Sequence, residues 1–237
     1  MSAMPNVTTH SFTNCSAQAV ALAERVAAQL REAIAARGTA VIAVSGGSTP
    51  KDFFARLSRE ALDWAQVTVT LVDERWVPDT DARSNAKLVE TTLLQNAARA
   101  ARFVPLYTGT PTPDAGLAEA EARIAALPAP FDVVVLGMGE DGHTASFFPG
   151  GDRLAEALDP QGTAKVLPMQ APGAGEPRIT LTLPVLLDTR ALYLLVSGEK
   201  KRDLLADVRL GLADAKNYPV RAVVKQDRVP LAVYWCP

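Results

Sequence analysis

Residues 131–150 read FDVVVLGMGEDGHTASFFPG and contain an apolar run, a glycine-rich turn and a histidine in direct succession. The apolar run, residues 131–136, includes three consecutive valines, and such a run predicts a buried strand. The turn at 137–142 follows it, and His143 comes next. Ligands of open α/β sheets bind at the carboxyl ends of strands, so we expect His143 to lie at a ligand site.

Strand and helix patterns alternate along the rest of the chain. The expected strands are 39–44, 67–72, 131–136, 178–183 and 191–196, and the expected helices are 17–36, 50–58, 84–94, 114–126 and 199–210. Ser16 and Ser84 are expected to cap helices, and Gly38 to end one. We expect loops at 73–83 and 149–177. The alternation predicts an α/β fold: a Rossmann-like, mostly parallel sheet with helices on both faces, in one domain spanning 1–237.

Composition excludes several classes of protein. The formal net charge is −2 and hydrophobic residues make up 48% of the chain, which is ordinary for a globular protein with a sizeable core. No basic stripe is interleaved with aromatic residues, so we expect no nucleic-acid partner. No apolar run approaches the roughly 20 residues of a membrane span, so we expect no membrane partner. The first 14 residues lack the basic start and apolar core of a signal peptide.

The two cysteines, Cys15 and Cys236, lie near opposite ends of the chain without a CxxC context. We therefore expect neither a disulfide nor a zinc site, and a cytoplasmic location. A cysteine nucleophile is disfavoured because both cysteines are far in sequence from the glycine turns. The GxSxG elbow of serine hydrolases and the HExxH motif of zinc proteases are absent.

Residues 43–50, AVSGGSTP, form a glycine turn between an expected strand and an expected helix. Glycines let the backbone approach a ligand closely, and amides at a helix start suit a phosphate. The alternative is a plain strand-to-helix turn capped by Ser48 or Thr49. The turn is not a P-loop because it lacks the GK[ST] ending.

The turn at 137–142 formally matches GxGxxG, the dinucleotide-binding pattern. Glu140 and Asp141 would place two carboxylates beside a pyrophosphate, and the usual acidic residue about 20 positions further on is missing. We therefore expect no nicotinamide or flavin cofactor. Asp141 is better suited to hold the ring of His143, although a structural or capping histidine is the alternative reading.

Cationic residues follow two further strands. Arg75, in the sequence Asp73-Glu74-Arg75, could clamp a carboxylate or phosphate, or belong to a solvated charge cluster. Lys200 and Lys201 stand at a helix start, where cations oppose the helix dipole unless an anion is bound. Arg178 opens the strand RITLTLP.

Taken together, these residues resemble 6-phosphogluconolactonases of the soluble bacterial type. The matching pieces are SGGSTP at 45–50, DERWVP at 73–78, SN at 84–85, LGMGEDGHTASFFPG at 136–150, RITLTLP at 178–184 and SGEKK at 197–201. They follow the family's order over most of the chain, whereas the segment after Pro219 matches less clearly.

The resemblance implies hydrolysis of 6-phospho-D-glucono-1,5-lactone to 6-phosphogluconate in the oxidative pentose phosphate pathway. It implies a small-molecule sugar-phosphate lactone as partner, no metal or organic cofactor, and a monomer or weak homodimer. The candidate catalytic residues are His143 as general base, Asp141 as its orienting carboxylate and Arg75. The candidate substrate-binding residues are Ser45, Gly46, Gly47, Ser48, Thr49, Asp73, Gly139, Arg178 and Lys201. Loop amides near Gly139, or Arg75, are candidate donors to the oxyanion. The choice of Lys201 over Lys200 rests on a GxxK element of the family.

Two other functions share this fold. Glucosamine-6-phosphate deaminase has a similar loop, DGHIAFNEP, whose glutamate is replaced here by Phe148, and it has a tyrosine where this chain has Arg75. Both departures favour the lactonase. A non-catalytic sugar-phosphate sensor domain would carry a DNA-binding helix-turn-helix, and only about 16 residues precede the first expected helix here.

Overall fold

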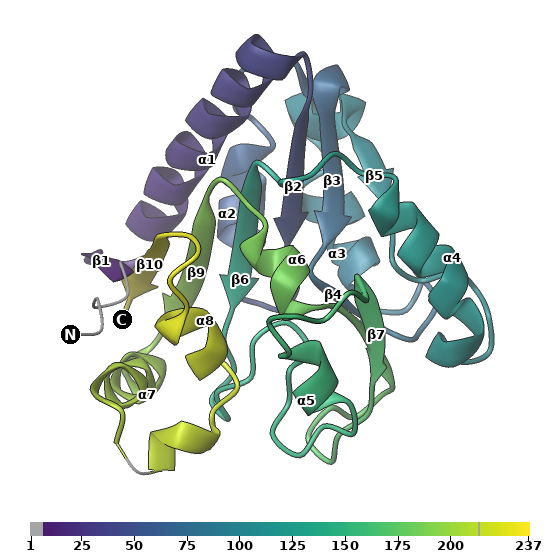
Figure 1. The fold of residues 1–237 in the computed structure, drawn as a ribbon. Helices are drawn as coiled ribbons and strands as arrows, with labels where there is room; N and C mark the ends of the chain where they lie inside the picture. Colours follow the sequence, from purple (N-terminus) through teal and green to yellow (C-terminus); the bar gives the residue numbers. More distant parts are fainter. Residues whose placement is uncertain (1–6, 213) are drawn as a thin grey trace.

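The computed structural model describes residues 7–212 and 214–237 and contains two sheets (Figure 1). The large sheet has seven parallel strands in the order β1-β10-β9-β6-β2-β3-β5. Their bounds are β1 Val7–Ser11, β2 Ala40–Val44, β3 Val67–Leu71, β5 Arg102–Val104, β6 Val133–Gly137, β9 Leu192–Ser197 and β10 Leu231–Cys236. The small antiparallel sheet has the order β4-β8-β7, with bounds β4 Asp73–Arg75, β7 Val166–Met169 and β8 Arg178–Leu181.

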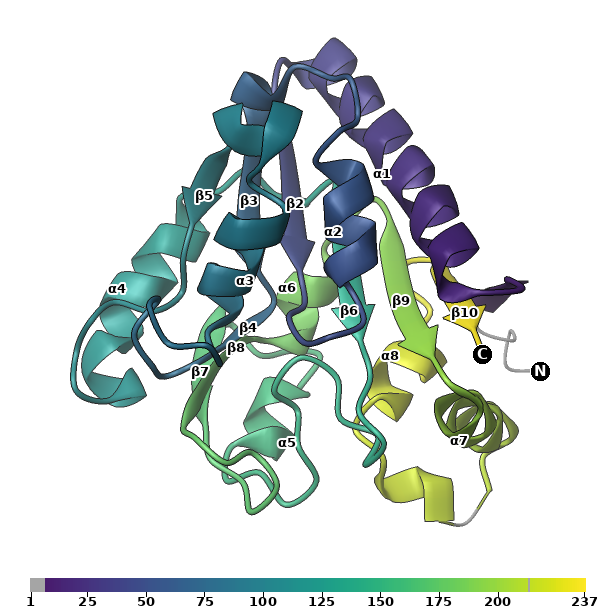
Figure 2. The ribbon, with the colours of Figure 1, turned by 180° about the vertical axis from the view of Figure 1, so that it is seen from behind.

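Helices cover both faces of the large sheet, as predicted. They are α1 Cys15–Arg37, α2 Lys51–Leu57, α3 Asn85–Thr92, α4 Pro113–Ala125, α5 Leu154–Ala157, α6 Leu183–Leu187, α7 Glu199–Leu210 and α8 Arg221–Lys225, with short 3-10 helices at Trp64–Gln66, Asn96–Ala100 and Asp214–Asn217. Figure 2 shows α1, α2 and α3 on one face, and Figure 1 shows α4, α6 and α8 on the opposite face.

The apolar composition of the central strands explains why they are buried between these layers. All five residues of β2, AVIAV, are buried, which is typical of a parallel strand covered on both faces. Helix α1 buries Leu22, Val26 and Leu30, which recur at helical spacing. Its buried Gln18 donates Nε2 hydrogen bonds to the carbonyls of Val196 and Tyr234, both at 2.8 Å, and so fixes α1 to β9 and β10.

The strand order reverses beside β2, and this reversal positions the site. From β2 the chain moves outward through β3 to β5, then returns to β6 on the other side of β2 and continues through β9 to β10. The loops after neighbouring strands therefore diverge there and leave a crevice at the carboxyl ends, where open α/β sheets bind ligands.

The predicted alternation of strands and helices is confirmed, and helix 199–210 has the expected bounds. Gly38 ends α1, and Ser84 caps α3, as expected. The prediction that Ser16 caps α1 is wrong. The N-cap is Asn14, whose side chain accepts a hydrogen bond from the N–H of Ala17 at 2.9 Å. The strand predicted at 131–136 instead spans Val133–Gly137, with Phe131 in an isolated bridge to Thr189.

Long-range pairing explains the larger differences from the predicted elements. Asp73–Arg75 is strand β4 rather than loop because it pairs with β8, and β8 belongs to the small sheet. The expected loop at 149–177 contains α5 and β7. The N-terminal segment around His10, which has no periodic pattern, forms β1 by pairing with β10. Each of these strands depends on a partner far away in sequence.

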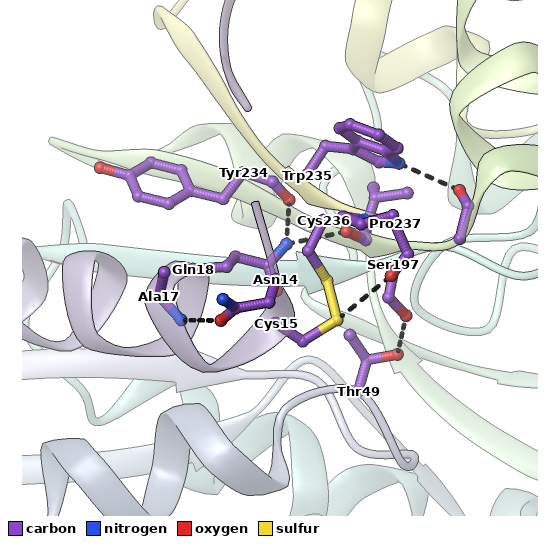
Figure 3. Close-up of a disulfide and its surroundings, with 12 residues drawn as sticks. Asn14, Cys15, Ala17, Gln18, Thr49, Ser197, Tyr234, Trp235, Cys236 and Pro237 are labelled. Atoms are coloured by element: carbon purple, nitrogen blue, oxygen red, sulfur yellow. Dashed lines mark hydrogen bonds between the residues drawn. A yellow bond between two sulfur atoms is a disulfide. The ribbon is translucent and has the colours of Figure 1, made fainter. Parts of the chain in front are cut away.

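The expectation that the chain has no disulfide is wrong. Cys15 and Cys236 form one, with an S–S distance of 2.04 Å and a sequence separation of 221 (Figure 3). Cys15 opens α1 and Cys236 ends β10. Because β10 lies near the edge of the sheet on which the start of α1 rests, the two Cα atoms come within 5.1 Å. The described helices include none with the length and apolar character needed to cross a membrane.

Candidate active site

A cavity of about 200 Å³ opens at the carboxyl ends of β2, β3, β6 and β9. Its lining comes from the 45–50 turn, from β4 and β8, from the loop after β6 and from the first turn of α7. The lining residues are Ser45, Gly46, Gly47, Ser48, Thr49, Pro50, Asp73, Arg75, Asn85, Val135, Leu136, Gly137, Met138, Gly139, His143, Ala145, Arg178, Leu195 and Lys201.

Every residue that the sequence proposed for substrate binding lines this cavity, and so do His143 and Arg75. Asp141 does not line it and instead contacts His143. Lys201 lines it, whereas Lys200 is exposed and does not. Helical geometry explains the difference, because consecutive helix residues point about 100° apart.

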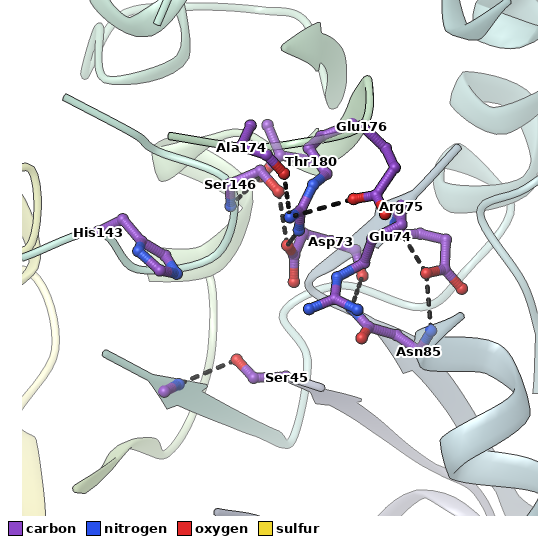
Figure 4. A network of polar contacts seen from close by, with 12 residues as sticks. Ser45, Asp73, Glu74, Arg75, Asn85, His143, Ser146, Ala174, Glu176 and Thr180 are labelled. Atoms are coloured by element: carbon purple, nitrogen blue, oxygen red, sulfur yellow. Dashed lines mark hydrogen bonds and ion pairs between the residues drawn. The ribbon is translucent and has the colours of Figure 1, made fainter. Parts of the chain in front are cut away.

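The 45–50 turn is held at both ends by side chains. The Ser45 hydroxyl accepts the N–H of Gly137 at 3.0 Å and so joins the ends of β2 and β6 (Figure 4). The Thr49 and Ser197 hydroxyls lie 3.3 Å apart, which joins the turn to the end of β9 (Figure 3). Between these ties, the N–H groups of residues 46–49 donate no hydrogen bond within the described parts of the chain. They are free to contact an anion in the cavity.

The loop after β6 presents the imidazole of His143 to the cavity. The Asp141 carboxylate accepts a hydrogen bond from the ring Nδ1 atom at 2.5 Å and from the backbone N–H of His143 at 3.1 Å. Burial raises the pKa of Asp141, but these hydrogen bonds outweigh burial and hold the pKa below its ordinary value. Since Nδ1 carries the proton in this arrangement, Nε2 is left as the basic nitrogen.

Glycine at position 139 is required by the closeness of this ring. A Cβ atom on Gly139 would lie 2.2 Å from Nδ1 of His143 and 2.5 Å from Oδ1 of Asp141. The N–H of Gly139 donates to the carbonyl of His143 at 2.9 Å, so this one amide of the loop is not free for an oxyanion. The loop closes on itself through this hydrogen bond, which orients His143 and uses the N–H of Gly139.

An aromatic ring packs against the histidine and links it to a buried arginine. The rings of Phe148 and His143 are stacked with centroids 4.3 Å apart. The guanidinium carbon of Arg178 lies 5.1 Å from the centroid of the same Phe148 ring, within the range of a cation–π interaction. Phe148 is buried. The imidazole of His143 therefore contacts an apolar ring as well as the polar carboxylate of Asp141.

Two guanidinium groups meet at the small sheet. Arg75 on β4 lies opposite Arg178 on β8, and the Nε atoms of both are buried without a hydrogen-bond partner among the described residues. Burial lowers the pKa of Arg178; the nearby carboxylate of Asp73 opposes this effect and the charge of Arg75 adds to it. Like charges placed opposite each other repel, so an anion in the cavity would relieve this repulsion.

Three neighbouring residues escaped the sequence analysis. Ser146 donates a hydrogen bond from its hydroxyl to Oδ2 of Asp73 at 2.5 Å (Figure 4). Arg178 lies 4.0 Å from the same oxygen. Asn85 lines the cavity, and Glu74 is buried behind it. All three belong to motif pieces quoted above, but a single sequence gives no signal of which residues in a motif face inward.

The turn at 137–142 does not lead into a helix, as a dinucleotide-binding turn would. Residues Thr144 and Phe147 form a tight β-bridge instead, and the next helix, α5, begins at Leu154. Within residues 7–212 and 214–237, no group of three or more His, Cys, Asp or Glu side chains is placed to hold a metal ion.

The chain is similar in sequence to several known proteins. The family model described as "Glucosamine-6-phosphate isomerases/6-phosphogluconolactonase" matches residues 14–235. A 6-phosphogluconolactonase of Rhizobium meliloti is 55% identical over 228 residues, covering 96% of this chain and 98% of the relative. A 6-phosphogluconolactonase of Pseudomonas aeruginosa is 44% identical over 220 residues, covering 93% of this chain and 91% of the relative.

The fold is also that of solved structures. The crystal structure of a 6-phosphogluconolactonase from Shewanella baltica superposes with a TM-score of 0.94 at 40% sequence identity, covering 99% of each chain. The family model extends past Pro219, where the motif resemblance is weakest, so the similarity includes the C-terminal strand.

Proposed function

Because the chain belongs to the glucosamine-6-phosphate isomerase/6-phosphogluconolactonase family, we propose that it hydrolyses 6-phospho-D-glucono-1,5-lactone to 6-phosphogluconate. This reaction belongs to the oxidative pentose phosphate pathway. The observation that carries the proposal is the cavity itself, in which one imidazole faces a group of cations and free amides. A lactone that carries a phosphate needs a base at one end and an anion site at the other.

His143 is the general base of the proposed mechanism. Nε2 takes a proton from water as the water oxygen forms a bond to the lactone carbonyl carbon. When the bond from that carbon to the ring oxygen breaks, the imidazolium returns the proton to the ring oxygen. A positioned base contributes about 10²- to 10⁴-fold to such a reaction. Asp141 stabilises the imidazolium and keeps Nδ1 protonated.

The phosphate of the substrate lies against the 46–49 turn in this proposal. The N–H groups of residues 46–49 donate no hydrogen bond among the described residues, and Lys201 lines the same cavity. Arg75 and Arg178 supply the remaining positive charge around the phosphate. The proposed donor to the oxyanion is a loop amide near Gly139 other than the N–H of Gly139 itself, which is committed. Asp73, held by Ser146, is placed to accept a hydrogen bond from a sugar hydroxyl.

The alternative activity is deamination of glucosamine 6-phosphate, which the wider family includes. The deaminase resemblance puts a glutamate where this chain has Phe148. Phe148 is buried and stacked on His143, so it supplies an apolar surface and cannot transfer protons. This contact favours the lactonase over the deaminase.

Parallel assays with two substrates test the proposal. Lactone disappearance is followed with and without EDTA, and ammonia release from glucosamine 6-phosphate is followed beside it. We expect lactone hydrolysis that EDTA does not change and no enzymatic ammonia release. Ammonia produced at an enzymatic rate, or lactonase activity lost on chelation, would contradict the assignment.

Four properties expected from the sequence remain proposals. We propose that residues 1–237 act as one domain, without a metal or organic cofactor, as a monomer or weak homodimer. We place the reaction in the cytoplasm because a phosphorylated sugar does not cross a membrane unaided. The disulfide between Cys15 and Cys236 is unusual for that reducing compartment.

A further inference from the structure

Asn85, at the start of α3, spans two walls of the cavity. Its side chain is buried, with the whole residue only 2% exposed, and it lines the cavity. The Nδ2 atom donates to the backbone carbonyl of Asp73 at 2.9 Å (Figure 4). This hydrogen bond fixes the amide of Asn85 to β4, the strand that carries Arg75.

On its other side, the Asn85 amide lies directly on the backbone of Gly46. A Cβ atom at position 46 would lie 1.8 Å from Oδ1 and 2.2 Å from Cγ of Asn85. No side chain fits there while the amide is in place, so the glycine at position 46 permits the contact. The asparagine therefore acts as a spacer between the 45–50 turn and β4.

A buried carboxylate holds Asn85 in place. Glu74 is 0% exposed, and Oε1 accepts the backbone N–H groups of Asn85 at 2.8 Å and Arg75 at 2.7 Å. Oε2 accepts the N–H of Ala86 at 2.7 Å and the hydroxyl of Ser84 at 3.1 Å. One side chain thus fixes both the start of α3 and the backbone of Arg75.

We propose that Asn85, held by Glu74, is a positioning residue for the phosphate end of the substrate. It sets the separation between the free amides of residues 46–49 and the guanidinium of Arg75, which the phosphate must contact together. This inference rests on the proposed lactonase function. Because binding contacts are sensitive to displacements below 1 Å, loss of the spacer weakens binding of the phosphorylated lactone more than binding of 1,5-gluconolactone, which has no phosphate.

The test measures kcat and KM of Asn85→Ala on both lactones. We expect KM for the phosphorylated lactone to rise by roughly 10-fold or more, with a much smaller change for 1,5-gluconolactone. Val89→Ala is the matched control, since Val89 is a buried residue of the same helix that does not line the cavity. It should lower the melting temperature and leave the ratio of kcat/KM between the two substrates near the wild-type value. Asn85→Ser replaces Asn85→Ala if the latter fails to fold.

A double-mutant cycle tests the contact with Gly46. Gly46→Ala alone should severely reduce activity on the phosphorylated lactone, because the added methyl group overlaps the Asn85 amide. In the Asn85→Ala background, Gly46→Ala should reduce activity much less, since the space of the Asn85 amide is then empty. Equal loss on both lactones in Asn85→Ala, or additive effects in the cycle, would overturn the inference. A wild-type enzyme that does not hydrolyse the phosphorylated lactone would instead overturn the proposed function.

Discussion

The Nδ1 atom of His143 lies 2.5 Å from the Oδ1 atom of Asp141, two residues earlier in the same loop. The loop is closed by the hydrogen bond from Gly139 to the carbonyl of His143, and Phe148 stacks on the ring. The imidazole is therefore oriented by a carboxylate, a backbone turn and an aromatic face, which leaves Nε2 as the nitrogen available for chemistry.

Replacing His143 with alanine is expected to reduce kcat on the phosphorylated lactone by about 10²-fold or more, because the general base is lost. His143→Asn keeps the polarity and much of the size of the side chain, and its kcat should fall by a similar factor. Circular dichroism checks that both variants fold. Near-normal turnover in either folded variant would exclude His143 as the base.

Asp141→Asn should change how stability depends on pH. The pKa of Asp141 is lowered in the folded protein, so ionised Asp141 stabilises the fold at pH values above its ordinary pKa of 3.8. That stabilisation is lost as the pH falls through the lower folded pKa. Denaturant unfolding should show wild type more stable than the variant above pH 3.8, with a difference that closes at lower pH. A difference that stays constant through the acid range would mean that the carboxylate charge is not responsible.

Lys201→Ala and Lys200→Ala form a matched pair of neighbouring changes. Lys201 lines the cavity and Lys200 does not, so only the first should raise KM for the phosphorylated lactone, by roughly 10-fold or more. Turnover of 1,5-gluconolactone should change little in both. If Lys201→Ala impairs both lactones equally, the lysine does not bind the phosphate.

Phe148→Leu should lower kcat by roughly 10-fold, because the ring that orients His143 and contacts Arg178 is removed while the buried volume is mostly kept. Phe147→Leu is the control: Phe147 is fully buried next to it but makes no stacking contact with His143. The control should lose stability and retain kcat. Equal kcat values for the two variants would count against a role of Phe148 in orienting the histidine.

Reduction of the disulfide should destabilise the protein. Cys15 and Cys236 close a loop of 221 positions, and a cross-link of that span restricts the unfolded chain strongly. The free energy of unfolding should fall by about 2–4 kcal/mol in Cys15→Ser/Cys236→Ser. A dithiol reductant should lower the melting temperature of the wild type and leave that of the double variant unchanged. Equal sensitivity of both proteins would show that the bond contributes nothing.

The sequence by itself determined the layers of this fold and the loops that carry the site. Runs such as 40–44 and 133–136 are apolar at every position and too short for a buried helix, which predicts strands covered on both faces. Glycine turns after these strands, together with Asp73, His143, Arg75, Arg178 and Lys201, predicted the polar lining of the cavity apart from Asn85, because carboxyl ends of parallel strands meet at one edge.

Only the tertiary structure decided which distant groups meet. The Cys15–Cys236 bond, the pairing of Arg75 with Arg178, and the contact of Asn85 with Gly46 each join segments that local patterns do not relate. The commitment of the Gly139 amide likewise appears only once the loop is closed. Local patterns indicate where most helices and strands lie, whereas these contacts depend on strand order and on side-chain packing between elements, which no short stretch of sequence contains.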